Sequence, residues 1–445
     1  MSIGKKTIAW CSLKMEEREK LNLLVVASPF PLQGGGALRA LRSLREYSKH
    51  FNTFLFIPWG SWGNKKTLQK SLDHLNELKR SGIKIVGYSS LPSMILKSQE
   101  VFKTRMFIEL FSYIFPGSQR IEVAEGKYDA VMVLHEPWDS VYSGKILAES
   151  FNIPSAVLLQ LPPFYGSRDR FSNIMKSRLM WRELISNKTV EKILYEGEAL
   201  FKSSLEERLA KIRYKKVLRK YDIVLGVSKS IAVEMGGEWL DKVRYLNPGV
   251  SLDKEDIDTI EKVRKKIRKK KDYIVLGGRV DAGKGLVEAL ISLKLISRRF
   301  PGIKLIVTGN VDKMALFNIK KKCKKLDIED KVIFTGFVPR EKRFEIVAGA
   351  RLMIYPSHVD AFPYAVLESL NLGTPVVAYR IPAIEINYGN VPGVEMVEEM
   401  DVEALSIKAI NMLEKGTEAV EAPKMKSWDE IMSEELNIVR ELLAK

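Results

Sequence analysis

Two carboxylates, Asp360 and Glu368, stand in one short segment, residues 354–378, with seven residues between them. The segment has the pattern of a strand end, a loop, a helix and a second strand. If Pro363 opens the helix, as proline often does at a first helical position, Asp360 lies in the loop and Glu368 about a turn and a half into the helix. The free N–H groups of residues 364–367 then form a seat for phosphate, and the two carboxylates can accept hydrogen bonds from hydroxyls. The segment therefore suits a ligand that is anionic in the middle and rich in hydroxyls at both ends, as a nucleotide sugar is.

A second group of residues, GGRVDAGKG at positions 277–285, directly follows an apolar strand pattern. Gly278 and Lys284 have the spacing of a P-loop, but that motif needs Ser or Thr after its lysine to hold magnesium. The chain has Gly285 at that place, so the P-loop interpretation fails where the chemistry requires a hydroxyl. The remaining interpretation is that Arg279 and Lys284 clamp a diphosphate, the guanidinium through paired hydrogen bonds and the ammonium as a point charge.

The elements that must position these residues are visible as continuous apolar runs, which are typical of buried parallel strands. The runs alternate with helical stretches, and this alternation indicates two doubly wound α/β domains in tandem. Ligands bind beyond the carboxyl ends of such strands, so two domains that face each other would form a binding cleft. The runs are residues 21–28, 53–57, 83–88, 130–134, 155–159 and 223–227, and then 273–276, 304–307, 331–334, 352–355 and 375–378.

The length of 445 residues favours two domains. The boundary is expected between residues 247 and 272, which contain an Asn-Pro-Gly turn and a strongly basic stretch. A capping-box pattern, Ser427 followed by Glu430, starts the last helix. We predict an N-terminal domain over residues 1–250, a C-terminal domain over 251–426, and a final helix over 427–445 that packs back toward the N-terminal domain.

The net charge of +17 is unevenly distributed. Residues 1–250 hold 39 Lys and Arg against 25 Asp and Glu, whereas residues 251–445 hold 33 against 30, so the first part carries +14 and the second +3. A basic half predicts an anionic partner, namely nucleic acid, an anionic membrane surface or a phosphorylated acceptor, with plain solubility as the alternative.

The targeting signals and the cysteine content of the sequence differ from those of exported proteins, and they lead us to expect a cytoplasmic protein. No apolar run approaches the length that spans a bilayer. A signal peptide is not expected, because acidic residues directly follow the short apolar stretch at residues 7–13. The two cysteines, Cys11 and Cys323, fit neither a disulfide framework nor a zinc site, and the four scattered histidines have no metal-ligand spacing.

The ordered set of motifs resembles the retaining glycosyltransferases of family 4, the glycosyl transferases group 1, which have the two-domain GT-B fold. The resemblance extends over most of the chain. Each motif alone is unspecific, and the ordered set is highly specific. The matching segments are residues 34–36, 247–250, 278–285, 334–338, 355–368, 373–378 and 427–428.

The resemblance implies roles for single residues. Arg279 and Lys284 would neutralise the donor diphosphate, so that the nucleoside diphosphate leaves without a metal ion. Glu368 would hold the ribose hydroxyls, and Asp360 would contact hydroxyls of the transferred sugar. The other expected donor contacts are the backbone near Phe337 and Val338 at the base, Gly35 and Gly36 beside the phosphates, and Phe362, Tyr364 and Ala365 around the helix start.

His135 follows an apolar strand at the place where the family often has a histidine near the transferred sugar. We expect a sugar contact, with a structural loop histidine as the alternative; for His358 we expect loop packing. Two residues depart from the family pattern: Asp360 is one methylene shorter than the usual glutamate, and Pro363 replaces a common glycine and removes one N–H donor. Both are interpreted as signs of a different donor sugar, with weakened activity as the alternative.

One further pattern, Asp256-Ile257-Asp258, superficially matches the Asp-x-Asp metal motif of the other main glycosyltransferase fold. It lies in a charged linker rather than at a strand end. We interpret it as helix surface, and expect neither a metal nor a cofactor besides the nucleotide diphosphate sugar, which is a substrate.

The acceptor is suggested by apolar and basic stretches in the N-terminal half. Residues 101–115 are apolar and aromatic, residues 171–184 place Phe171, Ile174, Met175, Trp181 and Leu184 near one helical face, and residues 211–220 are basic. A basic helix with aromatic residues on its apolar side can lie in a membrane interface. The alternative is an ordinary amphipathic helix packed on the sheet.

We therefore expect a cytoplasmic enzyme, peripheral on the inner face of the cell membrane, that transfers a hexose or related sugar to a lipid-linked or phosphorylated glycan. Alternatives on the same fold are a glycogen-synthase-like transferase acting on soluble glucan and a nucleotide-sugar epimerase. A non-enzymatic nucleic-acid binder is the third alternative. No nucleic-acid partner is expected, because such binders interleave aromatic and basic residues on a recognisable scaffold, which the sequence does not show.

Overall fold

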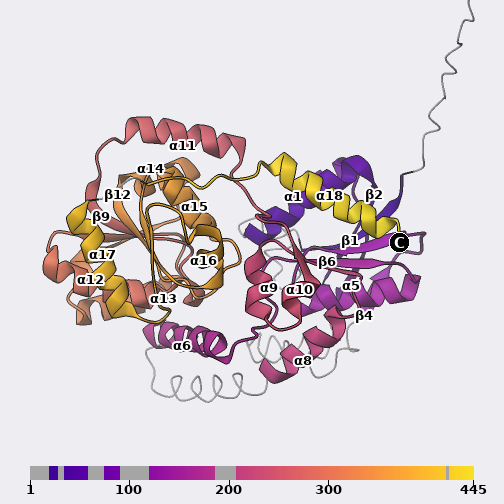
Figure 1. The fold of residues 1–445 in the computed structure, drawn as a ribbon, viewed down its shortest axis with the longest axis horizontal. Coiled ribbons are helices and arrows are strands. Elements are labelled where there is room, and N and C mark those ends of the chain that lie inside the picture. The colour runs from indigo at the N-terminus through magenta and orange to yellow at the C-terminus, as the bar shows by residue number, and fades with distance from the viewer. Residues whose placement is uncertain (1–19, 29–34, 59–74, 91–119, 186–206, 417–419) are drawn as a thin grey trace, which may run out of the picture.

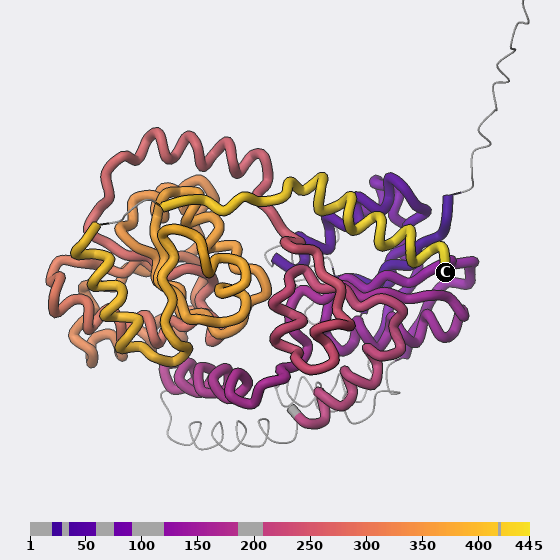
Figure 2. Tube along the Cα trace, in the orientation of Figure 1, coloured from indigo at the N-terminus to yellow at the C-terminus, as the bar shows by residue number. Residues whose placement is uncertain are grey.

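The computed structural model describes residues 20–28, 35–58, 75–90, 120–185, 207–416 and 420–445. Within these ranges the chain forms two α/β units, each built around its own sheet (Figure 1). The chain passes from the first unit to the second and returns to the first at its C-terminal end (Figure 2). The predicted α/β class with two doubly wound sheets is confirmed.

The sheet of the first unit is parallel throughout its described strands except at one edge, where β3 and β4 are antiparallel. Its order is β4 (Arg120–Val123), β3 (Lys84–Ser90), β2 (Asn52–Ile57), β1 (Asn22–Val26), β5 (Ala130–Val133), β6 (Ser155–Leu159), β7 (Ile223–Gly226) and β8 (Val243–Tyr245). The described helices of this half of the chain are α1 (Gly35–His50), α5 (Trp138–Phe151), α6 (Arg168–Ile185), α8 (Glu207–Leu218), α9 (Lys229–Met235) and α10 (Trp239–Lys242).

The second sheet is parallel, and its order is β11 (Val332–Gly336), β10 (Lys304–Thr308), β9 (Lys271–Leu276), β12 (Ala350–Tyr355), β13 (Val376–Tyr379) and β14 (Val394–Val397). Its helices are α11 (Lys254–Lys266), α12 (Leu286–Arg299), α13 (Lys313–Lys325), α14 (Arg340–Gly349), α15 (Tyr364–Asn371), α16 (Pro382–Tyr388) and α17 (Val402–Lys415), followed by α18 (Trp428–Leu443). Two 3₁₀ turns, η4 (Ala282–Lys284) and η5 (Glu329–Lys331), complete it.

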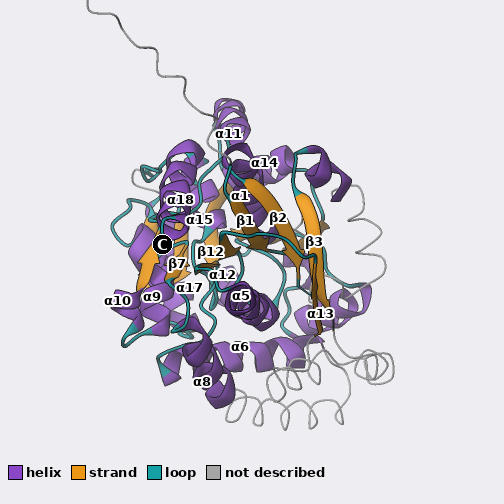
Figure 3. Ribbon diagram, turned by 90° about the vertical axis from the view of Figure 1, so that its right-hand side faces the viewer, coloured by secondary structure: helices purple, strands orange, loops and turns teal. Residues whose placement is uncertain are grey.

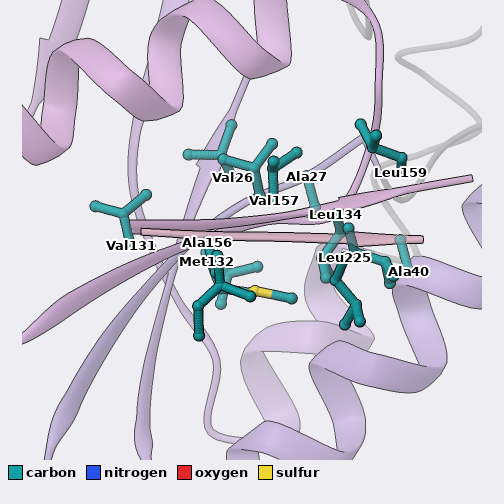
Figure 4. Packing of buried hydrophobic residues seen from close by; sticks show 14 of the residues in the cluster. Val26, Ala27, Ala40, Val131, Met132, Leu134, Ala156, Val157, Leu159 and Leu225 are labelled. Carbon is teal, nitrogen blue, oxygen red and sulfur yellow. The ribbon is translucent and has the colours of Figure 1, made fainter. Parts of the chain in front are cut away.

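The central strands are apolar on both faces because both faces are covered. Val26 and Val157 project from one face of the first sheet, and Met132 and Leu225 from the other (Figure 4). All four side chains are fully buried, and each such burial contributes about 1.5–3 kcal/mol to stability. The continuous apolar runs of the sequence follow from this two-sided burial.

Helix α6 belongs to the first half of the chain but packs on the second unit (Figure 1). Leu184 is buried in the core of the second unit, with Trp181 packed beside it. The Ser177 hydroxyl donates to the carbonyl oxygen of Ala282 at 2.6 Å, and the side-chain amide of Asn318 donates to the carbonyl of Ile185. The apolar side of the predicted membrane helix is therefore covered by protein. The alternative of a packed amphipathic helix is the better one, although the helix packs on the second unit rather than on the first sheet.

The other two stretches considered for membrane contact have different outcomes. Residues 101–115 lie outside the described residues. Most of residues 211–220 form helix α8, whose Tyr214 and Leu218 are buried in the first core. No helix among the described residues has both the length and the apolar character needed to cross a bilayer.

Helix α18 returns to the first unit (Figure 2), and its Ile431, Leu436 and Val439 are buried in the core of that unit. It starts with the predicted capping box, in which the Glu430 N–H donates to the Ser427 hydroxyl at 3.2 Å and the Ser427 N–H donates to the Glu430 carboxylate at 2.6 Å. The last helix thus fastens the end of the second half of the chain onto the first.

Candidate active site

The strand order of each sheet reverses once, between β1 and β5 in the first and between β9 and β12 in the second. Ligands of doubly wound sheets bind beyond the carboxyl ends of the strands at such a switch point. Four predicted site residues follow these strands: Gly36 after β1, His135 after β5, Lys284 after β9 and Asp360 after β12.

The loops after β9 and β12 contact each other directly. The backbone N–H of His358 donates to the carbonyl oxygen of Gly283 at 2.9 Å. Gly285 has φ +68°, and a Cβ built there would lie 2.1 Å from the carbonyl oxygen of Pro356. Only glycine can occupy this position without moving the backbone, and its presence brings the two predicted motifs together.

Lys284 and Asp360 form an ion pair at the meeting point of these loops. The Lys284 Nζ lies 2.6 Å from Asp360 Oδ2, and the two side chains are 13% and 14% exposed. Lys284 also donates to the carbonyl oxygen of Val359 at 2.9 Å and to the Ser357 hydroxyl at 3.3 Å. The Tyr355 hydroxyl donates to the same Asp360 oxygen. The lysine therefore already has a carboxylate partner in this structure.

Arg279 is placed in the same loop but is not held by it. Its side chain is 73% exposed and forms an ion pair of 3.5 Å with Asp281. The structure therefore puts the two predicted diphosphate cations in different states, since Lys284 is fixed and largely buried whereas Arg279 extends into solvent.

Glu368 lies on α15 and is almost fully buried. Its carboxylate accepts a hydrogen bond of 2.5 Å from Arg343 and lies 3.9 Å from Arg340, both on α14. Burial raises the pKa of Glu368, and the positive charges of Arg343 and Arg340 oppose this without cancelling it. The two arginines were not identified from the sequence, where their charges resemble an ordinary solvated helix surface.

Asp256 joins the same cluster, so its interpretation as helix surface is wrong. It is 4% exposed, pairs with Arg340 at 2.5 Å and accepts a hydrogen bond of 3.4 Å from the Tyr364 hydroxyl. Helix α11 packs across α14, and Asp256 lies on the buried side. Asp258 is exposed, because residues two apart on a helix point in nearly opposite directions.

The helix behind Asp360 begins one residue later than predicted. Pro363 is the N-cap, and its carbonyl oxygen accepts from the N–H groups of Val366 at 3.1 Å and Leu367 at 3.2 Å. Phe362 is buried, with its ring centroid 5.9 Å from that of Tyr388. Tyr364 and Ala365, in the first turn, are partly buried. These residues shape the loop that presents Asp360.

Phe337 and Val338 follow β11. Phe337 is 73% exposed, and its backbone N–H donates to the Asn310 side chain at 3.1 Å, while Val338 is half-buried. Asn310, directly after β10, was not identified from the sequence. Its side chain fixes the backbone at the place expected for the base.

On the first sheet, Gln160 connects His135 with Gly36. Its side-chain nitrogen donates to the carbonyl oxygens of Leu134 at 2.8 Å and Gly36 at 3.0 Å and lies 3.3 Å from His135 Nδ1. A Cβ on Gly36 would lie 3.0 Å from the Gln160 oxygen, whereas Gly35 has open space. Gln160 was missed, although a polar residue directly after an apolar run is the signal that led to His135.

His135 is buried, and burial lowers its pKa to about 4 against a smaller opposing effect of the Ser28 backbone. The ring is therefore neutral near physiological pH. Its Nε2 is buried without a hydrogen-bond partner among the described residues. A neutral ring can offer this nitrogen to a hydroxyl.

His358 packs in its loop, as expected, but inside a charged network. Its Nδ1 lies 2.7 Å from Glu399 and its Nε2 lies 2.7 Å from Glu288. Arg170 of α6 contacts Glu399 at 2.5 Å and Glu234 at 2.6 Å, and donates to the carbonyl oxygen of His358 at 2.8 Å. The loop that carries Asp360 is thus bonded to both halves of the chain.

Residues 258–427 match the family model described as glycosyl transferases group 1. The chain is 26% identical to mannosylfructose-phosphate synthase of Agrobacterium fabrum over 253 residues. The matched region covers 54% of this chain and 51% of that protein. It is 30% identical over 104 residues to alpha-monoglucosyldiacylglycerol synthase of Streptococcus pneumoniae, or 23% of each chain. The chain thus spans about half the length of the first relative and about a quarter of the second.

Solved structures share the fold over nearly the whole chain. Sucrose-phosphate synthase of Thermosynechococcus elongatus superposes with a TM-score of 0.62 at 14% identity, covering 96% of this chain and 100% of that one. HepE of Anabaena, in complex with UDP and glucose, superposes with a TM-score of 0.58 at 15% identity, covering 94% and 99%. At this identity the likeness concerns the GT-B fold. Within the described ranges, no cluster of three or more His, Cys, Asp and Glu side chains is arranged to hold a metal ion.

Proposed function

We propose that the chain is a retaining glycosyltransferase that moves a hexose or related sugar from a nucleotide diphosphate sugar. The observation that carries the proposal is the meeting of Lys284 and Asp360, 2.6 Å apart, at the switch point of the second sheet. Glu368 lies on the helix that follows the same loop. A cation for phosphate and carboxylates for sugar and ribose hydroxyls match the groups of such a donor. The group 1 match supports this proposal, and the UDP and glucose bound by HepE are consistent with it.

In this proposal the diphosphate is stabilised as a leaving group by positive charge. Lys284 supplies a fixed cation, and the exposed Arg279 folds onto the second phosphate when the donor binds. Charge placed where a leaving group becomes anionic lowers the barrier to bond cleavage. We propose that no metal ion takes part. The bond between the anomeric carbon and the diphosphate oxygen breaks, the acceptor oxygen bonds the anomeric carbon on the same face, and the acceptor's proton passes to the departing phosphate, so that the anomeric configuration is retained.

His135 acts in this scheme as a neutral hydrogen-bonding group rather than a cation. Its pKa of about 4 keeps the ring uncharged, and its Nε2 has no partner among the described residues. We propose that a hydroxyl of the transferred sugar forms a hydrogen bond with this nitrogen. Gly35 and Gly36 let the adjacent helix start approach the phosphates, and the exposed Phe337 and Val338 segment receives the base.

For the acceptor we propose a lipid-linked or phosphorylated glycan on the cytoplasmic face of the membrane. The +14 charge of residues 1–250 supports an anionic acceptor environment. The name of the pneumococcal relative, alpha-monoglucosyldiacylglycerol synthase, is that of an enzyme with a lipid product. A nucleic-acid partner forms no part of the proposal.

The test starts with a thermal-shift screen of nucleotide sugars on the purified protein, followed by mass spectrometry of lipid extracts incubated with the selected donor. Lys284→Ala and Glu368→Ala should each abolish transfer while leaving the circular dichroism spectrum unchanged. Full activity in either variant would refute the donor-site assignment. A product of inverted anomeric configuration refutes the retaining mechanism, and conversion of the donor without an acceptor indicates an epimerase.

A further inference from the structure

Helix α13 presents an unusual outward face. Met314 is 67% exposed and Phe317 is 62% exposed, which makes them two of the most exposed large apolar side chains among the described residues. The inner side of the helix is well packed, since Ile319 and Cys323 lie in the core of the second unit. Asn318 also donates from this side to the carbonyl of Ile185 on α6. The exposed face is therefore not needed to hold the helix in place.

Lysines surround the two apolar side chains. The helix contains six lysines and no acidic residue. At 100° per residue, Met314 and Phe317 fall within one arc of about 120° together with exposed lysines. These lysines are Lys313, Lys320, Lys321 and Lys324. We call this set of six side chains the α13 face.

This combination of side chains fits an anionic lipid surface better than other anionic partners. Exposed Phe and Met lose contact with water when they enter the headgroup region, and the lysines beside them pair with anionic headgroups. The face carries no Arg, Asn or Gln that could read base edges, which disfavours nucleic acid.

We propose that the α13 face docks the protein on an anionic membrane surface. This deepens the proposed function, because it rests on a membrane-bound acceptor and assigns the surface that reaches it. It also moves the contact from the N-terminal half to the second unit. The amphipathic helix first considered for this role, α6, has its apolar side covered by the second unit, and α13 packs beside it.

The experiment measures binding of the purified full chain to vesicles of phosphatidylcholine, alone or mixed with phosphatidylglycerol, by flotation at low and moderate salt. We expect salt-sensitive binding to the mixed vesicles only. Replacing Lys320, Lys321 and Lys324 by Gln should lower the partition coefficient on the order of a hundredfold, because each lysine near an anionic surface contributes about fivefold. The double variant Met314→Ser, Phe317→Ser should bind several-fold more weakly and lose its remaining binding at moderate salt.

Two matched controls carry the same changes elsewhere. Replacing the exposed Lys254, Lys262 and Lys265 by Gln removes the same charge from α11, which lies on the opposite side of the second unit from α13 (Figures 1 and 3). Ile407→Ser with Leu240→Ser removes two apolar side chains that are 52% and 48% exposed. Both controls should bind the mixed vesicles like the wild-type protein.

Three results would overturn the inference: equal binding to neutral and mixed vesicles, loss of binding in the α11 control as large as in the α13 variant, or tight binding of RNA or an acidic polypeptide without vesicle binding. The donor-induced thermal shift is measured on the same samples. Vesicle binding without a donor shift refutes the proposed donor site and keeps the docking surface, whereas a donor shift without vesicle binding does the reverse.

Discussion

At the scale of single residues, the site is organised by pairing each carboxylate with a cation from another element. Asp360 holds Lys284, and Glu368 holds Arg343. Lys284, Asp360 and Glu368 could be proposed as site residues from the sequence, because each stands in a motif with recognisable turn and helix signals. Arg343 could not be predicted, since its role depends on the packing of α14 beside α15, and the sequence of a charged helix does not encode which neighbour it meets.

Asp360 should compete with the donor diphosphate for Lys284. Asp360→Asn removes the competing charge while Ser357 and the Val359 carbonyl still hold the lysine. We expect this variant to bind the free nucleoside diphosphate about three- to tenfold more tightly, as removal of one nearby opposite charge implies, and to transfer sugar more slowly because a sugar contact is weakened. Isothermal titration calorimetry and initial rates measure the two effects. Weaker diphosphate binding in the variant would contradict the competition.

Arg343 should lower the free-energy cost of an ionised Glu368 in the folded protein. Burial raises the pKa of this carboxyl above that of the unfolded chain, so its ionisation costs stability as the pH rises through the unfolded and then the folded pKa. Arg343→Met removes the main compensating charge and raises the folded pKa further. We expect a loss of about 3 kcal/mol near pH 7 and a smaller loss near pH 5, where protonation relieves the unpaired charge.

Urea unfolding at the two pH values measures this difference. The double variant Arg343→Met, Glu368→Gln should recover most of the stability near pH 7, because the carboxylate that Arg343 compensates is replaced by a neutral amide. Arg244→Met is the control, since it breaks a pair with Glu441 in which both side chains are about half exposed. A loss in Arg343→Met that does not change with pH would show that the arginine acts through packing alone.

At the scale of elements, the strands were predictable and their partners less so. Runs such as residues 130–134 and 155–159 are buried on both faces and are therefore continuous in the sequence. Strands β4, β8 and β14 were not predicted because they are exposed or only partly buried over most of their length and so have no continuous apolar run. The helical pattern of α6 was predictable from its sequence. Its periodicity does not indicate on which of the two units the helix packs.

Helix α6 should stabilise the second unit although it precedes that unit in the chain. Leu184 is 6% exposed in the second core, and Leu→Ala at such a site costs about 2–5 kcal/mol. We expect Leu184→Ala to destabilise by this amount and to raise amide hydrogen exchange in α12 and α13, which contact α6. Lys176→Ala, on the exposed side of the same helix, is the control. Exchange that rises only in the first unit would disagree with the packing.

At the scale of the whole molecule, several contacts among the described residues join the two halves of the chain, including three that involve α1, α6 and the His358 loop. The buried Arg39 of α1 pairs with Glu435 of α18 and donates to the carbonyl oxygen of Gly249 at 2.7 Å, next to the start of the second unit. Helix α6 supplies the second contact. The third is the network of Arg170, Glu399 and His358, which reaches the loop of Asp360. The relative position of the two sheets is thus linked to the geometry of the candidate site.

The His358 network makes this linkage sensitive to pH. Burial alone lowers the pKa of His358, but hydrogen bonds and charges from Glu288 and Glu399 outweigh burial and raise it. Arg170 pairs with the same Glu399, and Glu234 in turn pairs with Arg170. A histidine whose folded pKa is raised contributes stability that is complete below its unfolded pKa of about 6.5 and is lost as the pH rises through the folded value. The wild-type protein should therefore lose this contribution to its stability as the pH rises above about 6.5 and through the raised pKa of His358. His358→Gln, which cannot titrate, should be less stable near pH 6 and lack this part of the decline, whereas His50→Gln on the exposed side of α1 should keep it. Thermal unfolding across this range decides the matter, and parallel curves for the wild type and His358→Gln would mean that the imidazolium does not stabilise this network.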